Sequence, residues 1–230
     1  MAKKGLTQAE IVAGIADMWI LLTDEQRTLI AEHLEVKKYK KNQVIYSEGE
    51  TPIHLLCLLE GKVKIYRDGV GGRSQIMRVI KPVEYFGYRA YFAEESFVTA
   101  AAAFEASIVC VIPMNIITRL VAENNRLAMF FIKRLSIDLG LSDERTVNLT
   151  QKHIRGRLAE SLLFLRETYG LEEDGATISI FLSREDLANL SNMTTSNAIR
   201  TLSNFASERL FAIDGRKIKI MNEEGLKRIS

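Results

Sequence analysis

Hydrophobic and polar residues change their spacing along the chain, and the first change separates a helical start from a run of strands. Residues 6–34 follow a helical pattern, in which Thr23 and Gln26 form a capping box at the start of one helix. The charged run 37–42 is expected to be a solvated strand edge and turn. From there short apolar runs alternate with Gly and Pro turns, which predicts an antiparallel sandwich or barrel. Its strands are expected near residues 44–46, 54–59, 62–67, 74–80, 97–104 and 107–112.

After Pro113 the pattern becomes helical again. A short helix is expected over Asn115–Glu123, and a longer one runs from Asn124 to about Leu149. Apolar residues cover so wide an arc of the long helix that one sheet is not expected to bury them all. Burial against the same helix of a second subunit would cover the rest, as in a short coiled coil; the alternative is that the helix packs only on its own β-domain. The residues predicted to form the dimer contact are Leu127, Phe130, Phe131, Leu135, Ile137 and Leu141.

The last third of the chain reads as a compact helical domain that begins after a hinge near 150–154. A helix is expected over Ile154–Tyr169, an acidic turn over Gly170–Gly175 and a strand over Ile178–Leu182. Two short helices follow, separated by a tight turn at 191–193. Ser183 is placed to cap the first of them and Thr194 the second.

The second short helix has one apolar and one polar side. Ala198, Leu202 and Phe205 recur at spacings of four and three, so they pack inward, and the small polar residues and Arg200 point outward. After it, two alternating segments flank Asp214-Gly215, a favoured hairpin turn. This is the order of a winged helix-turn-helix, whose second helix enters the DNA major groove. The residues predicted to contact DNA are Ser183, Thr194, Thr195, Ser196, Asn197, Arg200, Lys217 and Lys219.

Charge and composition narrow the possible functions. The 230 residues have a formal net charge of +2, and residues 150–230 carry 12 Lys or Arg against 11 Asp or Glu. The predicted DNA-binding domain is therefore not basic overall, although doubling a small basic face in a dimer would compensate.

With two cysteines the chain encodes no disulfide framework, and we expect Cys57 and Cys110 to be small core residues, with a redox pair as the alternative. No apolar run approaches the ~20 residues of a membrane helix, and no signal region follows Met1, so a cytoplasmic protein is expected.

Motifs of enzyme chemistry are not evident. His33, His54 and His153 are scattered over unlike segments, so they do not predict a metal site. The Gly69–Gly72 stretch lacks a following Lys-Ser or Lys-Thr and is expected to be a hairpin turn rather than a phosphate loop. We therefore expect no enzyme. The other function considered is a ligand-sensing regulatory protein of the cyclic-nucleotide-domain type that does not bind DNA.

The order of β-domain, long helix and winged helix-turn-helix resembles the cyclic-AMP receptor protein/fumarate-nitrate regulator family of bacterial transcription factors. The resemblance implies an α+β fold with a β-roll of the antiparallel jelly-roll type over 1–123, a dimerisation helix over 124–149 and a DNA-binding domain over 150–230. It also implies a homodimer that couples an effector signal to operator binding and contacts RNA polymerase. The matching segments are Ile45 with Glu48-Gly49, residues 59–65, Tyr85-Phe86-Gly87, residues 156–163 with Leu165, and residues 183–188 and 194–202 with the wing.

The chain departs from the cyclic-nucleotide-binding members at the phosphate site. Phe86-Gly87 is followed by Tyr88-Arg89-Ala90, so the glutamate that would bond the ribose is missing, and residues 94–99 contain no arginine. A buried phosphate needs a cation and fixed donors, so cyclic AMP is not expected to bind. The effector is therefore unidentified, and plain core packing without a ligand is the alternative. The residues considered for an effector pocket are Tyr85, Gly87, Tyr88, Arg89, Phe97, Val98, Thr99 and Ser142.

Of two prosthetic groups considered, an iron–sulfur cluster is disfavoured, and haem is left open with weak support. The oxygen-sensing branch carries a cysteine cluster near its amino terminus, but residues 1–56 contain no cysteine, so an iron–sulfur cluster is not expected. Haem would suit the aromatic composition of residues 85–97, but this segment has no histidine to serve as an axial ligand.

In the reading helix, Thr195-Ser196 stand where members that recognise the familiar half-site carry Arg-Glu. The operator sequence is therefore not transferable.

Overall fold

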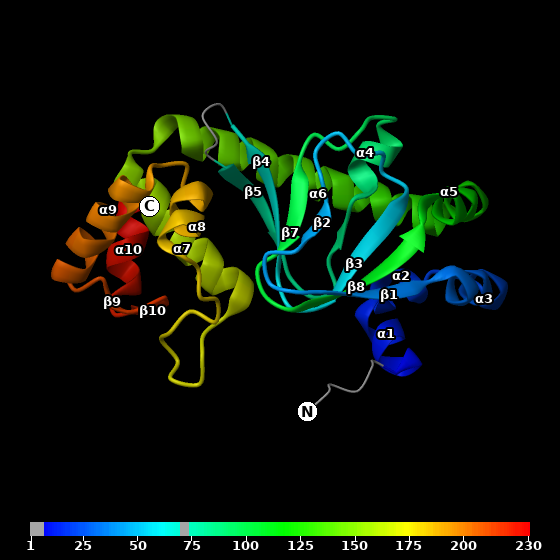
Figure 1. Cartoon of the computed structure of the whole chain (residues 1–230), viewed down its shortest axis with the longest axis horizontal. Helices are drawn as coiled ribbons and strands as arrows, with labels where there is room; N and C mark the ends of the chain where they lie inside the picture. Colours follow the sequence, from blue (N-terminus) through cyan, green and yellow to red (C-terminus); the bar gives the residue numbers. More distant parts are fainter. Residues whose placement is uncertain (1–6, 70–73) are drawn as a thin grey trace. The chain divides into compact units, whose positions relative to one another are not determined.

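The computed structural model describes residues 7–69 and 74–230, which form two compact units (Figure 1). The first contains the described residues of 1–67 and 77–139, and the second those of 68–76 and 140–230. The division falls inside the long helix rather than at its two ends, where the sequence placed the domain boundaries. Most of the hairpin turn predicted at Gly69–Gly72 lies outside the described residues.

Helices begin the first unit, and their ends follow the capping residues. Thr7 and Glu10 form a capping box for α1 (Gln8–Gly14), and α2 (Ala16–Trp19) follows after Ile15. The predicted box at Thr23 is confirmed at the start of α3 (Asp24–His33), where the Thr23 hydroxyl accepts from the Gln26 amide at 3.3 Å. These helices pack against the first of two sheets.

Two four-stranded antiparallel sheets follow, as the short apolar runs predict. The first sheet has the order β1-β8-β3-β6 and the second β2-β7-β4-β5. The charged segment after α3 is edge strand β1, and it ends in a turn where Asn42 takes φ 64°. The strands are β1 (Glu35–Tyr39), β2 (Val44–Tyr46), β3 (His54–Glu60), β4 (Val63–Asp68), β5 (Ser74–Ile80), β6 (Tyr85–Phe86), β7 (Ala100–Ala103) and β8 (Ser107–Pro113).

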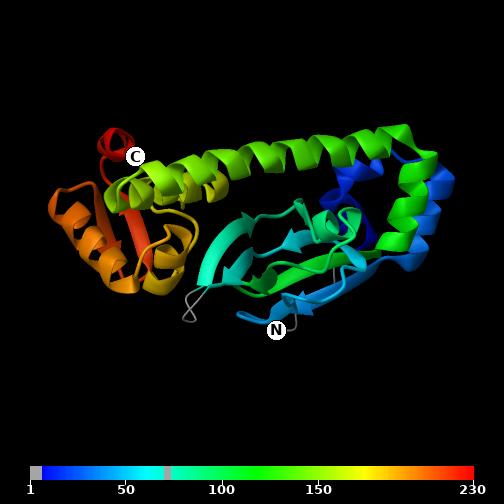
Figure 2. The same cartoon turned by 90° about the horizontal axis from the view of Figure 1, so that it is seen from above.

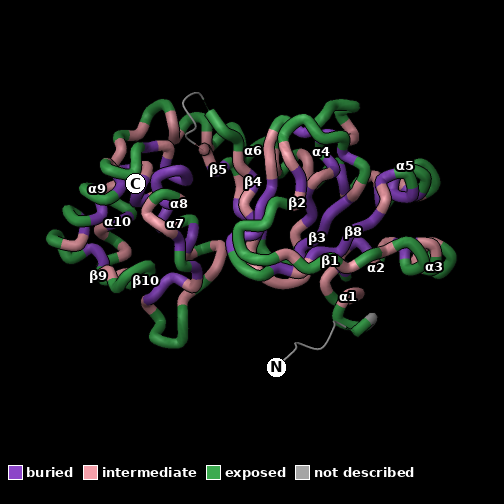
Figure 3. Tube along the Cα trace, in the orientation of Figure 1, coloured by how far each residue is buried: buried purple, intermediate pink, exposed green. Residues whose placement is uncertain are grey.

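Strand β3 is covered on both faces, and this explains its unbroken apolar run. Alternate side chains of a strand point to opposite faces. Leu56 and Leu58 face the second sheet, and Leu55 and Cys57 face the helices, so the unit has two hydrophobic layers. Figure 3 shows that most of β3 is buried. Cys57 and Cys110 pair in register across β3 and β8. Burial raises the pKa of the Cys57 thiol far above its ordinary value and that of Cys110 to about 12, so both thiols stay protonated and unreactive, as core residues do.

The segment between β5 and β7 differs from the sequence expectation. It contains the short strand β6 and a helical turn, α4 (Tyr88–Phe92), neither of which was predicted, and β7 begins at Ala100 rather than at Phe97. Gly87 precedes α4 with φ 87°, and a Cβ atom there would lie 3.2 Å from the His54 carbonyl oxygen. A glycine is therefore required at this position by both conformation and space.

Helix α5 (Met114–Glu123) leads into the long helix α6 (Asn125–Gln151), whose first half lies along the sheets of the first unit (Figure 2). Leu127 and Phe131 are 0% and 3% exposed, within the same core as Tyr85 and Tyr88. Phe130 and Leu135 pack partly against that core. Their own subunit therefore covers Leu127 and Phe131, which leaves them no surface for the predicted dimer contact, whereas Phe130 and Leu135 are half-buried and their part in that contact stays a prediction.

Two polar clusters fasten α6 to the β-domain on that same side. Asp17 accepts hydrogen bonds from Arg134 and, at 3.0 Å, from the Tyr85 hydroxyl, and the Arg134 guanidinium lies 4.7 Å from the Phe130 ring centroid. One turn along the helix, Asp138 pairs with Arg78 at 2.7 Å. The helix is thus held by ion pairs as well as by apolar contacts.

The second unit is built from helices around one small hairpin. Its elements are the end of α6, α7 (Ile154–Tyr169), α8 (Arg184–Leu190), α9 (Thr195–Ser207), β9 (Phe211–Asp214), β10 (Lys217–Ile220) and α10 (Glu223–Ile229). The strand predicted over Ile178–Leu182 is not formed. Isolated bridges join Leu171 to Ile178 and Thr177 to Lys219, so backbone pairing with the wing is confined to the beginning of this segment. Helix α10 was not predicted. No helix within the described ranges is long and apolar enough to cross a bilayer.

Arg157 on α7 joins three pieces of the second unit. Its guanidinium donates to the carbonyls of Leu149 and Lys152 at the end of α6, at 3.4 and 3.3 Å, and to those of Ser191 and Asn192 in the turn after α8, both at 3.2 Å. Leu149 lies in the last turn of α6, and the other three residues directly follow the ends of α6 and α8, so one guanidinium binds carbonyls at two helix ends.

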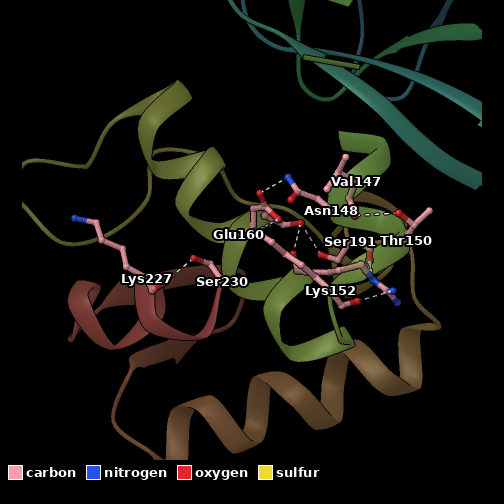
Figure 4. A network of polar contacts seen from close by, with 10 residues as sticks. Val147, Asn148, Thr150, Lys152, Glu160, Ser191, Lys227 and Ser230 are labelled. Carbon is pink, nitrogen blue, oxygen red and sulfur yellow. Dashed lines mark hydrogen bonds and ion pairs between the residues drawn. The ribbon is translucent and has the colours of Figure 1, made fainter. Parts of the chain in front are cut away.

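Neighbouring side chains support this arrangement. Glu160 on α7 accepts from Asn148 and pairs with Lys152 at 3.2 Å, so α7 also holds the last turn of α6 (Figure 4). The hydroxyl of Ser191, which is 1% exposed, donates to that of Ser161 at 2.9 Å. The end of α6, helix α7 and the turn after α8 therefore form one rigid body.

Replacing Arg157 with Lys should loosen this body, because an ammonium cannot reach four carbonyls in two directions. We expect a loss of about 2 kcal/mol of unfolding free energy and faster amide hydrogen exchange across residues 188–193. Arg155→Lys is the matched control: Arg155 lies on the same helix but makes an exposed ion pair with Glu208, so the exchange of 188–193 should stay unchanged. Equal effects of the two substitutions would contradict this role of Arg157.

Candidate nucleic-acid interface

Helices α8 and α9 are capped as the sequence predicts. The Ser183 hydroxyl accepts from the Asp186 amide at 3.0 Å and donates to the Asp186 carboxylate at 2.7 Å, and the Thr194 hydroxyl accepts from the Asn197 amide at 3.2 Å. The turn between the helices contains no glycine. Asn192 takes its left-handed position, with φ 49°, which asparagine tolerates better than most residues do.

Helix α9 separates an inward from an outward face. Ala198, Leu202 and Phe205 are at most 1% exposed. Thr195, Ser196 and Arg200 are exposed, and Arg200 donates to the Asn197 side chain at 3.0 Å, which orients the guanidinium along the helix surface. A helix that presents small polar groups and one guanidinium can enter a major groove without steric hindrance and bond to base edges.

The sequence analysis missed one residue on this outward face. Ile199 is 47% exposed and follows Thr195 by four residues, so it lies beside Thr195 and Ser196. An exposed branched apolar side chain between polar neighbours can contact a thymine methyl group. Its position outside the Ala198–Leu202–Phe205 row was a signal available in the sequence.

The wing is the predicted hairpin, with Lys217 opposite Asp214 and Ile218 opposite Ile213. Ile218 is buried, and Lys217 and Lys219 on either side of it are exposed. Both lysines have partners within the unit: the Lys217 ammonium lies 5.8 Å from the Phe181 ring centroid, and that of Lys219 lies 3.2 Å from an Asp174 carboxylate oxygen. Neither partner was foreseen from the sequence.

Arg184, which the sequence analysis did not single out, connects the wing to the two helices. It lies at the first position of α8 and donates to the Gly215 carbonyl at the tip of the hairpin, at 2.8 Å. The predicted DNA contacts on α8, α9 and the wing therefore belong to one structural unit. The contacts themselves remain predictions.

The residues considered for an effector pocket do not gather in one place. Tyr85 and Tyr88 belong to the core that faces the helices, whereas Phe97 lies between the two sheets and stacks on Tyr46 with ring centroids 3.8 Å apart. Tyr85 lies on β6, Tyr88 on α4 and Phe97 in the connection before β7, so nearness in sequence did not mean a shared pocket. Val98 is 44% exposed, and Ser142 is exposed on the part of α6 that belongs to the second unit.

Of the remaining candidates, Thr99 is half-buried and Arg89 is exposed. Thr99 hydrogen-bonds to the Tyr46 hydroxyl, and burial raises the pKa of that phenol to about 12. Arg89, on α4 just after Gly87, pairs with Glu95 at 3.3 Å, and both side chains are 53% exposed. Within residues 7–69 and 74–230, no three His, Cys, Asp or Glu side chains are grouped to hold a metal ion.

Comparison with known proteins matches both units. A family model described as the cyclic nucleotide-binding domain matches residues 36–124, and one described as the Crp-like helix-turn-helix domain matches residues 156–229. A CRP-like cAMP-activated global transcriptional regulator of Mycobacterium tuberculosis is 22% identical over 86% of this chain and 89% of its own length. The anaerobic regulatory protein of Haemophilus influenzae is 23% identical over 89% of this chain and 80% of its own length.

The fold has the same parts in the same order as solved structures of such regulators. FixK2 from Bradyrhizobium japonicum superimposes with a TM-score of 0.77 at 21% identity, covering 86% of this chain and 97% of its own. The two family matches span both units in the family's order. The chain therefore belongs to the cyclic-AMP receptor protein/fumarate-nitrate regulator (CRP/FNR) family of transcription regulators.

Proposed function

We propose that this protein regulates transcription by binding double-stranded DNA as a homodimer, with α9 in the major groove. The observation that carries the proposal is the outward face of α9, where Thr195, Ser196 and Arg200 are exposed on a helix whose opposite face is fully buried. The hairpin that carries Lys217 and Lys219 belongs to the same unit. A ligand-sensing protein without a DNA target would leave both features without a role.

Within this interface we assign sequence readout to α9 and phosphate contact to the wing. A guanidinium can bond two acceptors of one guanine, and hydroxyls of threonine and serine can bond bases or phosphates. Lysines on a hairpin are suited to phosphate, because an ammonium acts as a point charge without directional preference. RNA polymerase is the proposed further partner, as the family resemblance implies.

Arg200→Ala should weaken binding to the specific site by roughly 1–3 kcal/mol and leave binding to random duplex nearly unchanged. Lys217→Ala with Lys219→Ala should weaken all sequences alike and flatten the salt dependence. Titration of labelled duplexes, with a site selected from genomic fragments, separates the two effects. Arg228→Ala on α10 removes the same charge away from the proposed contacts and is the control. Intact operator affinity in the Arg200 variant would contradict the assignment of α9.

The dimer contact is proposed on the side of α6 that its own subunit leaves open. Met129, Ile132 and Leu139 are 59%, 53% and 63% exposed. Their spacings of three and seven residues place them within about 80° of one another around the helix, on a side that points away from Leu127. A second copy of the same helix would bury this row as in a two-stranded coiled coil. Ile137 and Leu141, which the sequence assigned to the contact, are also exposed but face another side.

Leu139→Asp should convert the dimer into monomers at micromolar concentration, because it puts a charge in the proposed seam of each subunit. Leu141→Asp is the matched control, since Leu141 is 57% exposed on the same helix but about 160° of rotation away. Light scattering should show a monomer for the first variant and a dimer for the second. A monomer for Leu141→Asp and a dimer for Leu139→Asp would show that the contact involves the Leu141 side instead. A monomeric wild-type chain would contradict the proposed dimer.

We further propose that cyclic AMP is not the effector of the β-domain. Phe97 and Tyr46 stack at 3.8 Å between the sheets, in the interior that an effector would occupy. Two arginines lie near Tyr46, and both are already paired, Arg89 with Glu95 and Arg78 with Asp138. A cyclic phosphate would therefore have to displace an aromatic stack and compete with a carboxylate. Within the described residues no three His, Cys, Asp or Glu side chains are grouped to hold an iron–sulfur cluster, and weakly supported haem or a different small effector is compatible with this proposal.

Calorimetry with cyclic AMP should give no binding heat at physiological concentrations, and DNA affinity should not respond to the nucleotide. Glu95→Gln tests whether the ion pair of Arg89 is the obstacle to binding, because it removes the Glu95 carboxylate that holds the Arg89 guanidinium. We expect no binding in this variant either, since the aromatic stack stays in place. Micromolar binding by the wild-type chain, lost on Arg89→Ala, would overturn the proposal and make Arg89 the phosphate anchor.

A further inference from the structure

An acidic loop runs beside the wing. Glu172, Glu173 and Asp174 are exposed in the connection between α7 and α8. Backbone hydrogen bonds join residues 176–178, which follow the loop, to strand β10. The Ile178 amide donates to the Ile218 carbonyl at 3.0 Å, and the Ile220 amide donates to the Ala176 carbonyl at 2.9 Å. The loop is therefore fixed along the strand that carries Lys217 and Lys219.

Asp174 holds a fixed negative charge at this place. Its carboxylate accepts from the Ala176 amide at 3.0 Å and from the amide and hydroxyl of Thr177, both at 2.8 Å. These hydrogen bonds, from Thr177 above all, hold the pKa of the carboxyl well below its usual range. The same carboxylate lies 3.2 Å from the Lys219 ammonium. Because three local bonds anchor Asp174, it cannot swing away when Lys219 meets another anion.

The two glutamates bring further negative charge to the second wing lysine. Glu172, Glu173, Asp174 and Thr177 line a shallow hollow of about 290 Å³ together with Lys217. The arrangement also accounts for an overall feature of the sequence. Residues 150–230 carry 12 basic and 11 acidic side chains, and three of the acidic ones lie next to the basic hairpin rather than on a distant surface.

We propose that the loop residues Glu172, Glu173 and Asp174 compete with DNA phosphates for the wing lysines and so limit the sequence-independent affinity of this protein for DNA. The inference rests on the proposed function, because it assumes that the wing meets phosphate. Sequence-independent affinity arises from lysine and arginine charges that replace counterions on the phosphates. A carboxylate bound to one of these lysines reduces that exchange, and free carboxylates beside them repel the backbone. Operator binding then depends more strongly on the base contacts of α9.

The test uses the full chain with Glu172→Gln and Glu173→Gln together, because both side chains are exposed and their replacement keeps the shape of the loop. Binding to a random duplex of about one to two dozen base pairs is titrated over a range of salt concentrations. We expect affinity about threefold or more above that of the wild type, with a steeper dependence on salt. The affinity for a selected operator should rise by the same factor, because the loop charges act on the phosphates of any sequence.

Two controls isolate the cause. Glu144→Gln with Glu167→Gln makes the same change in net charge at exposed positions on α6 and α7, and it should raise affinity less than the loop variant does. In a background of Lys217→Ala with Lys219→Ala the gain from the loop variant should disappear. Asp174→Asn provides a second variant, which keeps an acceptor for the Thr177 amide and should act in the same direction.

The proposal is overturned if the loop variant binds random duplex no better than the charge-matched control, or if its gain persists without the wing lysines. These results leave the DNA-binding function intact, because the wild-type chain still binds. A wild-type chain that binds no duplex at any salt concentration contradicts the proposed function itself, and the role of the loop with it.

Discussion

The guanidinium of Arg157 is the interaction on which the DNA-binding unit depends most. It bonds carbonyls at the end of α6 and in the turn between α8 and α9 from a single position on α7. A planar group with five donors can satisfy two helix ends together, which no other side chain does. Whatever moves the last turn of α6 therefore moves the turn before the reading helix. Buried Ser161 and Ser191 add a direct bond between α7 and that turn.

In the proposed dimer, helix α6 has two partners on two faces, which accounts for its unusual apolar content. One face is bound to its own β-domain through Leu127, Phe131 and the ion pairs of Arg134 and Asp138. The row through Met129, Ile132 and Leu139 has no cover within the described chain. The periodicity correctly indicated more apolar surface than one partner could bury. It could not say which row belongs to which partner, because spacing defines the faces of a helix but not what lies against them.

Local chemistry made much of the remaining fold predictable. Capping hydroxyls at Thr23, Ser183 and Thr194 and the Asp214-Gly215 turn act over a few residues, so their effect is visible in the sequence. The effector candidates do not share one pocket, because Tyr85 on β6 packs toward the helices and Phe97, in the connection before β7, packs between the sheets. The ion pair of Lys219 with Asp174 joins residues 45 positions apart, and it depends on the hydrogen bonds that hold a loop against a hairpin, which local sequence does not reveal. The near-balance of basic and acidic residues in 150–230 indicated that the domain is not basic overall, but it could not show that acidic residues lie beside the wing lysines.

The most direct test of this account is recovery of genomic DNA bound to the protein in cells, followed by sequencing and footprinting of the enriched fragments. The account predicts a common sequence with two-fold symmetry, whose half-sites lie about one helical turn, roughly 34 Å, apart. The Arg200→Ala protein should lose that enrichment. Fragments with no shared sequence, or a motif made of a single unpaired half-site, would contradict a dimeric regulator that reads DNA through α9.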